Sequence, residues 1–120
     1  MPAVEVDPDK IKQVLLNISL NSLAAIKEGG KLTIELLPGA DNLTVIISDN
    51  GAGIEKMDLL RIYDPYFTSK PAGTGLGLAV VQKIMEAHGG KINVESIAGK
   101  GTKVFLYFPF QDITKLRNEI

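Results

Sequence analysis

Apolar residues recur at helical spacing near the start of the chain. Asp7-Pro8-Asp9 supplies an N-cap aspartate, a proline for the first helical position and a further acid near the positive end of the helix dipole, and Gly29-Gly30 ends the helix. Two apolar rows run along the surface of this helix: Ile11, Val14, Leu15, Ile18 and Ala25 in the first, and Leu16, Leu20 and Leu23 in the second. We therefore expect a long helix that is buried on two sides.

Alternating apolar and polar residues predict four strands, at 31–36, 43–49, 91–97 and 102–108. Two further helices are expected, a short one near 56–62 and a long one from about Leu76 to His88 that ends at Gly89-Gly90. The order helix, hairpin, helix, hairpin indicates an α/β (α+β) two-layer sandwich, in which helices cover one face of a mixed, largely antiparallel sheet. We expect residues 61–76 to form a mobile lid, and we assign no role to the tail at 110–120.

Size and composition favour a single domain over residues 1–120, because a chain of 120 residues with 45% apolar content can bury one core of ordinary size. The net charge of −1 predicts no broad attraction to nucleic acid or to an anionic membrane. The absence of cysteine excludes disulfides and thiolate metal sites, and no apolar run reaches the ~20 residues that span a bilayer. We expect a cytoplasmic domain without direct membrane contact, whether or not its parent protein is anchored to a membrane.

A narrow polar stripe lies between the two apolar rows of the first helix, where Gln13, Asn17 and Asn21 follow one another at a spacing of four. Half-buried amides need hydrogen-bond or metal partners, and the carbonyl oxygen of Asn21 would suit Mg²⁺, which prefers oxygen ligands. Ordinary hydrogen bonding at a helix end or to the sheet is the alternative explanation of the stripe.

Asp49 ends a predicted strand and points the same way as that strand's apolar residues. Its carboxylate could accept a hydrogen bond from an exocyclic amine such as adenine N6, and the glycines of Asn50-Gly51-Ala52-Gly53 would let the backbone approach a flat base. The same residues are also a strong turn sequence, so a plain hairpin turn remains open at this point.

The segment Gly73-Thr74-Gly75-Leu76-Gly77-Leu78 leads directly into the second long helix, whose first N–H groups can meet phosphate oxygens. It does not follow a strand, as a Rossmann motif would, and the chain contains no GxxxxGK[ST] P-loop. A glycine hinge is the alternative. Lys70, just upstream, could neutralise a terminal phosphate, although a lone lysine is more often a solvated surface charge. His88 is expected to cap helix carbonyls and to have no catalytic role.

Taken in order, these motifs resemble those of the superfamily of gyrase, heat-shock chaperones, mismatch-repair proteins and histidine kinases, which binds ATP in the Bergerat fold. QVLLNISLNSLAAI resembles the N box, DNGAGI the first glycine box, YDPYFTSK the F box, GTGLGL the second glycine box and GKGT the third. The resemblance covers about Val6 to Phe108 and points to the ATP-binding catalytic domain of a sensor histidine kinase.

The resemblance also implies a role for each site residue. Around the phosphates, it makes Asn21 the Mg²⁺ ligand, Asn17 a polar partner of the phosphates and Lys70 a contact of the γ-phosphate. The lid residues that close over the phosphates would be Gly73, Thr74, Gly75 and Gly77. Around the base, Asp49 would accept from the adenine amine and Thr102 would reach the adenine edge. The residues that shape this pocket or flank the base would be Gly51, Gly53, Ile54 and Leu76.

Asn17 distinguishes among the members of the superfamily, because the ATP-hydrolysing members resemble one another in carrying a glutamate there that activates water. An amide cannot act as a general base, whereas the neutral imidazole of an acceptor histidine already offers a lone pair. We therefore expect a kinase that binds ATP or ADP with Mg²⁺ and hydrolyses ATP very slowly on its own.

The resemblance implies partners as well. The acceptor histidine would lie on a separate helical dimerisation domain, a response regulator would be reached indirectly, and the isolated domain would be a monomer. An ATPase switch of the gyrase or chaperone kind, a nucleotide-binding module without catalysis and a serine-directed kinase are the alternatives.

Overall fold

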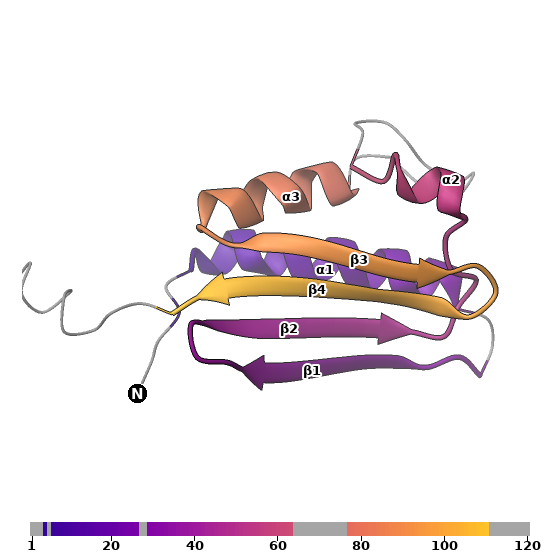
Figure 1. Ribbon diagram of the computed structural model, residues 1–120, viewed down its shortest axis with the longest axis horizontal. Helices are drawn as coiled ribbons and strands as arrows, with labels where there is room; N and C mark the ends of the chain where they lie inside the picture. The colour runs from indigo at the N-terminus through magenta and orange to yellow at the C-terminus, as the bar shows by residue number, and fades with distance from the viewer. Residues whose placement is uncertain (1–3, 5, 27–28, 64–76, 111–120) are drawn as a thin grey trace, which may run out of the picture.

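The computed structural model of the chain describes residues 4, 6–26, 29–63 and 77–110 (Figure 1). The elements follow in the order α1 (Pro8–Ala25), β1 (Leu32–Pro38), β2 (Asn42–Asp49), α2 (Lys56–Leu59), α3 (Gly77–Ala87), β3 (Lys91–Ile97) and β4 (Gly101–Pro109). The strands form one sheet in the order β1-β2-β4-β3, and each neighbouring pair is antiparallel. The predicted two-layer sandwich is confirmed, and among the described residues the sheet is antiparallel throughout.

The first helix begins where the sequence predicts. The Oδ1 atom of Asp7 accepts hydrogen bonds from the backbone N–H groups of Asp9 (3.0 Å) and Lys10 (3.4 Å), and Pro8 occupies the first turn. These contacts satisfy N–H groups that have no partner inside the helix. Asp7 is therefore the N-cap of α1.

The prediction that α1 is buried on two sides is wrong. Val14 and Ile18 are fully buried, but Leu16, Leu20 and Leu23 are 58%, 54% and 57% exposed. At about 100° per residue these three leucines lie on the side of the helix opposite to Val14 and Ile18. The described residues supply a sheet on only one side of α1, so Val14 and Ile18 of the first row pack while the second row faces solvent, and Leu15 of the first row is exposed as well.

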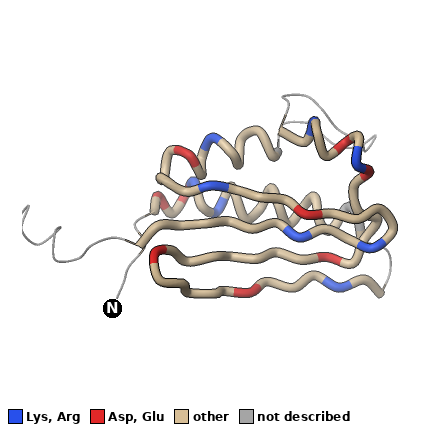
Figure 2. The backbone as a smooth tube through the Cα atoms, in the orientation of Figure 1, with Lys and Arg blue, Asp and Glu red and all other residues tan. Residues whose placement is uncertain are grey.

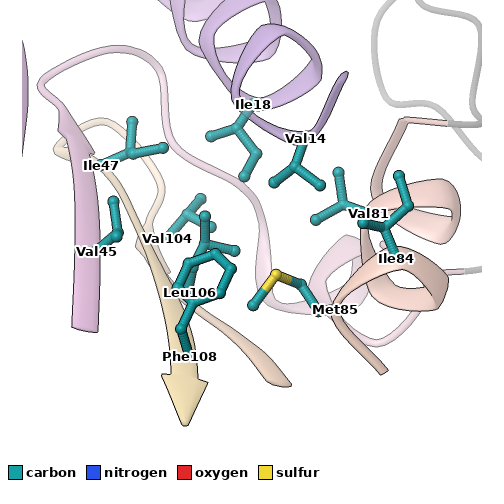
Figure 3. Packing of buried hydrophobic residues seen from close by; sticks show 10 residues of the cluster. All are labelled: Val14, Ile18, Val45, Ile47, Val81, Ile84, Met85, Val104, Leu106 and Phe108. Carbon is teal, nitrogen blue, oxygen red and sulfur yellow. The ribbon is translucent and has the colours of Figure 1, made fainter. Parts of the chain in front are cut away.

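The core lies between the two long helices and one face of the sheet (Figure 3). Helix α1 contributes Val14 and Ile18, and α3 contributes Val81, Ile84 and Met85. The inward residues of β2 and β4 complete the cluster, which adds Val45, Ile47, Val104, Leu106 and Phe108. All five of these strand residues belong to one face of the sheet, since their register places them opposite one another or two positions apart. We call this surface the helix face.

Edge strand β1 extends past the cover of the helices. Leu36 pairs with Val45, and Ile34 pairs with Ile47, so both residues belong to the helix face. They are nevertheless 63% and 55% exposed, whereas their partners are buried. The helices therefore cover the middle of the sheet more completely than its β1 edge.

Charged residues of both signs are spread along the described strands and helices, without a large region of one sign (Figure 2). This distribution agrees with the near-zero net charge of the sequence. None of the described helices has the length and apolar character needed to cross a membrane.

Candidate functional site

A row of polar residues crosses one end of the helix face. The pairing of the strands places Leu32 opposite Asp49, Asp49 opposite Thr102, and Thr102 opposite Ser96. Because directly paired residues project from the same face, Asp49, Thr102 and Ser96 continue the face that carries the core. All three are half-buried. We call Asp49, Thr102 and Ser96 the polar row.

Asp49 is held by the turn that follows β2. Its Oδ1 atom accepts a hydrogen bond of 2.9 Å from the backbone N–H of Gly51. The neighbouring Asn50 fastens the turn to the start of β1, because its Oδ1 atom accepts from Lys31 N at 2.7 Å and its own N–H donates to Lys31 O at 3.3 Å. The turn chemistry of this sequence is therefore present, and it fixes the carboxylate at the end of the helix face.

Two glycines allow backbone segments to touch at this end of the sheet. A Cβ on Gly53, whose φ is 71°, would lie 2.2 Å from the carbonyl oxygen of Ile97. A Cβ on Gly101, whose φ is 129°, would lie 2.1 Å from the carbonyl oxygen of Asp49. Real Cβ atoms do not come this close, so both positions require glycine for contact as well as for conformation. Gly53 was expected to shape a pocket, and its structural contact is with the β3–β4 hairpin.

Ser96 joins three parts of the site. Its Oγ atom accepts a hydrogen bond from Ile54 N at 2.7 Å, donates to Gly101 O at 3.0 Å, and lies 2.8 Å from Oγ1 of Thr102. Neither Ser96 nor Gly101 was predicted from the sequence as a site residue. The signal for Ser96 was available, because it follows Ile92 and Val94 at the spacing of two that marks the inward face of β3. The signal for Gly101 was its place in the GKGT motif.

The two candidate asparagines lie one turn apart on the same side of α1. Asn17 is half-buried and Asn21 is exposed. The C-terminal half of α1, the start of α3 at Gly77 and the Asp49 end of β2 all lie toward the same end of the domain (Figure 1). The amides and the polar row thus belong to one region.

The remaining lid residues, Lys70, Gly73, Thr74, Gly75 and Leu76, lie outside the described residues. Gly77 is the first residue of α3, so the helix expected from about Leu76 is confirmed. Tyr63 of the YDPYFTSK motif is half-buried, and burial raises the pKa of its phenol, as suits a packed aromatic side chain. Tyr66 and Phe67 of the same motif are also outside the described residues.

His88 lies at the opposite end of the helix face, after the last turn of α3. Its Nε2 atom accepts a hydrogen bond of 3.0 Å from Asp7 N, because a backbone N–H can only donate. Its Nδ1 atom therefore carries the proton and donates to Ile84 O at 2.8 Å. The predicted capping role is confirmed, and both ring nitrogens are used within the fold.

Comparison with known proteins places this chain in a family. Residues 6–112 match the family model described as the histidine kinase-, DNA gyrase B- and HSP90-like ATPase. The chain belongs to this family. The resemblance drawn from the five sequence motifs is thereby confirmed.

Individual relatives point to one branch of the family. The chain is 48% identical to the sensor histidine kinase ZraS of Salmonella typhi over 107 residues, which cover 88% of this chain and 23% of that protein. It is 43% identical to sporulation kinase D of Bacillus subtilis over 106 residues, which cover 88% of this chain and 21% of that one. The chain thus spans about a quarter or less of the length of these relatives.

Solved structures agree with the sequence matches. The catalytic domain of histidine kinase ThkA superposes with a TM-score of 0.78 at 37% identity, over 88% of this chain and 70% of that one. The mycobacterial sensor histidine kinase MprB superposes with a TM-score of 0.82 at 25% identity, over 90% of this chain and 77% of that one. The fold is that of histidine kinase catalytic domains.

Proposed function

We propose that this domain binds ATP with Mg²⁺ and donates the γ-phosphoryl group to a histidine on a separate helical domain of the same kinase. The observation that carries the proposal is the pairing of Asp49 with Thr102 at one end of an otherwise apolar helix face, in a chain of the ATPase family. A half-buried carboxylate beside apolar side chains suits a flat apolar base that has one amino group.

In the proposed pocket, the carboxylate of Asp49 accepts a hydrogen bond from the adenine amine. The Gly51 N–H occupies Oδ1, and the same bond sets the direction in which the second oxygen, Oδ2, is presented. Thr102 lies beside Asp49 on the neighbouring strand and reaches the same edge of the base. Gly51 and Gly53 bring the backbone close to the ring, and Ile54 and Leu76 flank its faces.

The phosphates would lie toward α1 and the start of α3. Asn17 meets them with its amide, Lys70 neutralises the γ-phosphate, and Gly73, Thr74, Gly75 and Gly77 offer backbone N–H groups at the entrance to a helix. In this arrangement the acceptor domain approaches from outside and brings the nucleophile.

Magnesium fits the donors available. The described residues contain no group of three or more His, Cys, Asp or Glu side chains, so no cage of protein ligands is present among them. Mg²⁺ is commonly held by one or two protein oxygens together with phosphate oxygens and water, and the amide oxygen of Asn21, an exposed residue of α1, has the chemistry for that role. When bound, the ion would neutralise phosphate charge.

The chemistry needs little from this chain beyond positioning. A lone pair on the acceptor imidazole forms the bond to the γ-phosphorus, the bond from that phosphorus to the bridging oxygen breaks, and the electrons leave on ADP. Asn17 holds the phosphates without taking a proton from water, because an amide is not a general base. The domain therefore favours transfer to histidine over hydrolysis.

Binding is tested by titration calorimetry of the chain with ATP and Mg²⁺. Asp49→Asn keeps the size of the side chain but replaces one acceptor oxygen with a donor, so ATP affinity should fall about 10- to 100-fold, the usual value of a hydrogen bond to a charged group. Glu95→Gln is the matched control, since Glu95 is an exposed carboxylate on the other face of β3. Equal affinities for the Asp49→Asn variant and the wild type would contradict the proposed base pocket.

Transfer is tested by mixing the chain with the helical domain of its own kinase and γ-labelled ATP. The label should appear on histidine, in a phosphoprotein that is labile in acid. ATP binding without any transfer would contradict the kinase proposal and favour a binding module. Rapid, repeated release of phosphate by the chain alone would instead favour an ATPase switch.

Within this proposal the domain acts in the cytoplasm as a monomer, and the phosphoryl group passes from the acceptor histidine to a response regulator. Light scattering of the isolated chain tests the monomer directly, since a dimer would double the measured mass.

A further inference from the structure

The three contacts of the Ser96 hydroxyl allow its proton to be placed. A serine hydroxyl has one proton and two lone pairs. The N–H of Ile54 can only donate, so it occupies one lone pair of Oγ, at 2.7 Å. The carbonyl oxygen of Gly101 can only accept, so the contact of 3.0 Å requires the single proton of Ser96.

The contact between Ser96 and Thr102 then has one direction. The second lone pair of Ser96 Oγ is left for Thr102, whose Oγ1 atom lies 2.8 Å away, and Thr102 must donate its own proton there. In this arrangement the chain of bonds runs from Thr102 to Ser96 to Gly101, and every proton and lone pair of Ser96 is used. The reverse direction would remove the side-chain donor from the Gly101 carbonyl and leave the Thr102 proton outside the cluster. Hydrogen bonds that follow one direction also polarise one another favourably.

We infer that Ser96 sets base specificity, because it takes the proton of Thr102 and leaves that hydroxyl only lone pairs with which to meet a base. The inference rests on the proposed nucleotide function. Asp49, beside Thr102 in the polar row, is an acceptor as well when ionised. The polar wall of the pocket is thus made of acceptors. It matches the amino group at position 6 of a purine and opposes a 6-oxo group, which would place an acceptor against acceptors.

Ser96 is in this sense a positioning residue, which acts on the base through Thr102. The backbone supports the arrangement, because Gly101 reaches its place by the close contact with Asp49 and Ile54 belongs to the segment that follows the Asp49 turn. The hydroxyl of Ser96 therefore links Ile54, on one side of the proposed base pocket, to Gly101 and Thr102 on the other side through one set of hydrogen bonds with fixed directions.

The test compares ATP with inosine triphosphate, which carries an oxo group where ATP carries the amine. Binding of each nucleotide with Mg²⁺ is measured by calorimetry for the wild type, Ser96→Ala and Ser96→Thr. In Ser96→Ala the Thr102 hydroxyl loses its acceptor and can turn its proton to the base. The ratio of ATP affinity to inosine triphosphate affinity should therefore fall about fivefold to tenfold, the value of one ordinary hydrogen bond. Ser96→Thr keeps a hydroxyl at this position and should therefore retain the wild-type ratio of the two affinities.

A second variant keeps the test decisive if Ser96→Ala does not fold. Thr102→Val removes the hydroxyl at nearly constant side-chain shape, so it should weaken the binding of ATP more than the binding of inosine triphosphate. In a chain that already carries Thr102→Val, adding Ser96→Ala should cause no further decrease in the ratio of ATP affinity to inosine triphosphate affinity. Ser48→Ala, which removes a hydroxyl from the other face of β2, is the control and should leave the preference unchanged.

The outcomes separate the inference from the proposed function. An unchanged preference in Ser96→Ala, or equal weakening of both nucleotides in Thr102→Val, would overturn the inference while ATP binding stands. A wild-type chain that binds neither nucleotide would overturn the proposed function and the inference together.

Discussion

The helix face of the sheet has two ends that are built differently. In its middle and toward the His88 end, side chains do the packing, and the inward positions of β2 and β4 are apolar residues that are buried except for the half-buried Leu43. At the Asp49 end, the inward positions are polar, and the close contacts are between backbone segments at Gly53 and Gly101. The first region therefore supplies most of the buried apolar surface that stabilises the fold, and we propose that the second mainly supplies binding.

The largest expected effect is on the packed region. Leu106→Ala should lower the free energy of unfolding by about 2–5 kcal/mol, because Leu106 is fully buried and its truncation leaves a cavity. Urea denaturation measures the change, and ATP affinity below the transition should stay within about threefold of wild type. Leu36→Ala is a matched control, since Leu36 lies in the same row across the sheet but is 63% exposed. Similar losses of unfolding free energy in both variants would show that burial does not determine how much these two positions contribute to stability.

Gly101→Ala should affect the site and the fold together. The added Cβ would meet the carbonyl oxygen of Asp49, so β2 and β4 must shift at the base pocket. We expect a loss of about 1–3 kcal/mol in stability from strain and a clear loss of ATP affinity. Gly99→Ala is the control, because Gly99 also has a positive φ, of 82°, but has nothing within 4 Å of its added Cβ. If Gly99→Ala weakens ATP binding as much as Gly101→Ala does, then the backbone conformation of the β3–β4 hairpin, and not the contact between Gly101 and Asp49, governs the site.

His88→Leu should change stability without changing binding. The substitution removes the bonds to Ile84 O and Asp7 N, which tie the end of α3 to the start of α1. A loss of about 1–2 kcal/mol is expected from urea denaturation, since both backbone groups lose a partner, the Ile84 carbonyl in a partly buried place and the Asp7 N–H in an exposed one. ATP affinity should match the wild type, and a large decrease would mean that the two ends of the helix face are not separate.

Leu20→Gln should have the smallest effect. Leu20 lies on the outer side of α1, and exposed substitutions of this kind usually change stability by about 0.5 kcal/mol or less. Ile18→Val, two residues earlier on the buried side, should cost about 0.5–1.5 kcal/mol although it removes only one methylene group. Thermal denaturation of the pair measures the difference between the two sides of the helix.

Periodicity in the sequence predicted the main elements of the fold well. The N-cap at Asp7, the start of both long helices and all four strands are where apolar spacing and turn residues place them. The first helix, however, ends at Ala25 with Ile26 as its C-cap, before the Gly29-Gly30 that was expected to end it. The short helix was expected over 56–62, but α2 covers only Lys56–Leu59. Local rules suffice for these elements because capping and alternation act over a few residues.

Burial was harder to predict than secondary structure. Leu16, Leu20 and Leu23 have helical spacing like that of the buried row, and nothing local distinguishes a row that meets a sheet from one that meets solvent. The strand order β1-β2-β4-β3 decides which rows are covered, and this order depends on long-range pairing. The sequence therefore identified the apolar rows of α1 but not which of them is in the core.

The candidate site divides in the same way. Asp49 was found because it interrupts the inward apolar positions of a strand. Ser96 interrupts β3 in the same manner, yet its importance depends on contacts with Ile54, Gly101 and Thr102, which only the assembled sheet brings together. The assigned roles of Asn17, Asn21, Asp49 and Thr102 toward a nucleotide stay predictions until the binding experiments are made.

The close approach of the Gly101 backbone to the carbonyl oxygen of Asp49 also limits how this end of the sheet can change. The spacing between these two strands is set by main-chain atoms, which are the same in every amino acid, so rotamer changes nearby have little means of widening or narrowing it. Neighbouring side chains can therefore diverge, or be redesigned, while the dimensions of this end of the sheet persist, provided that this one position remains without a side chain.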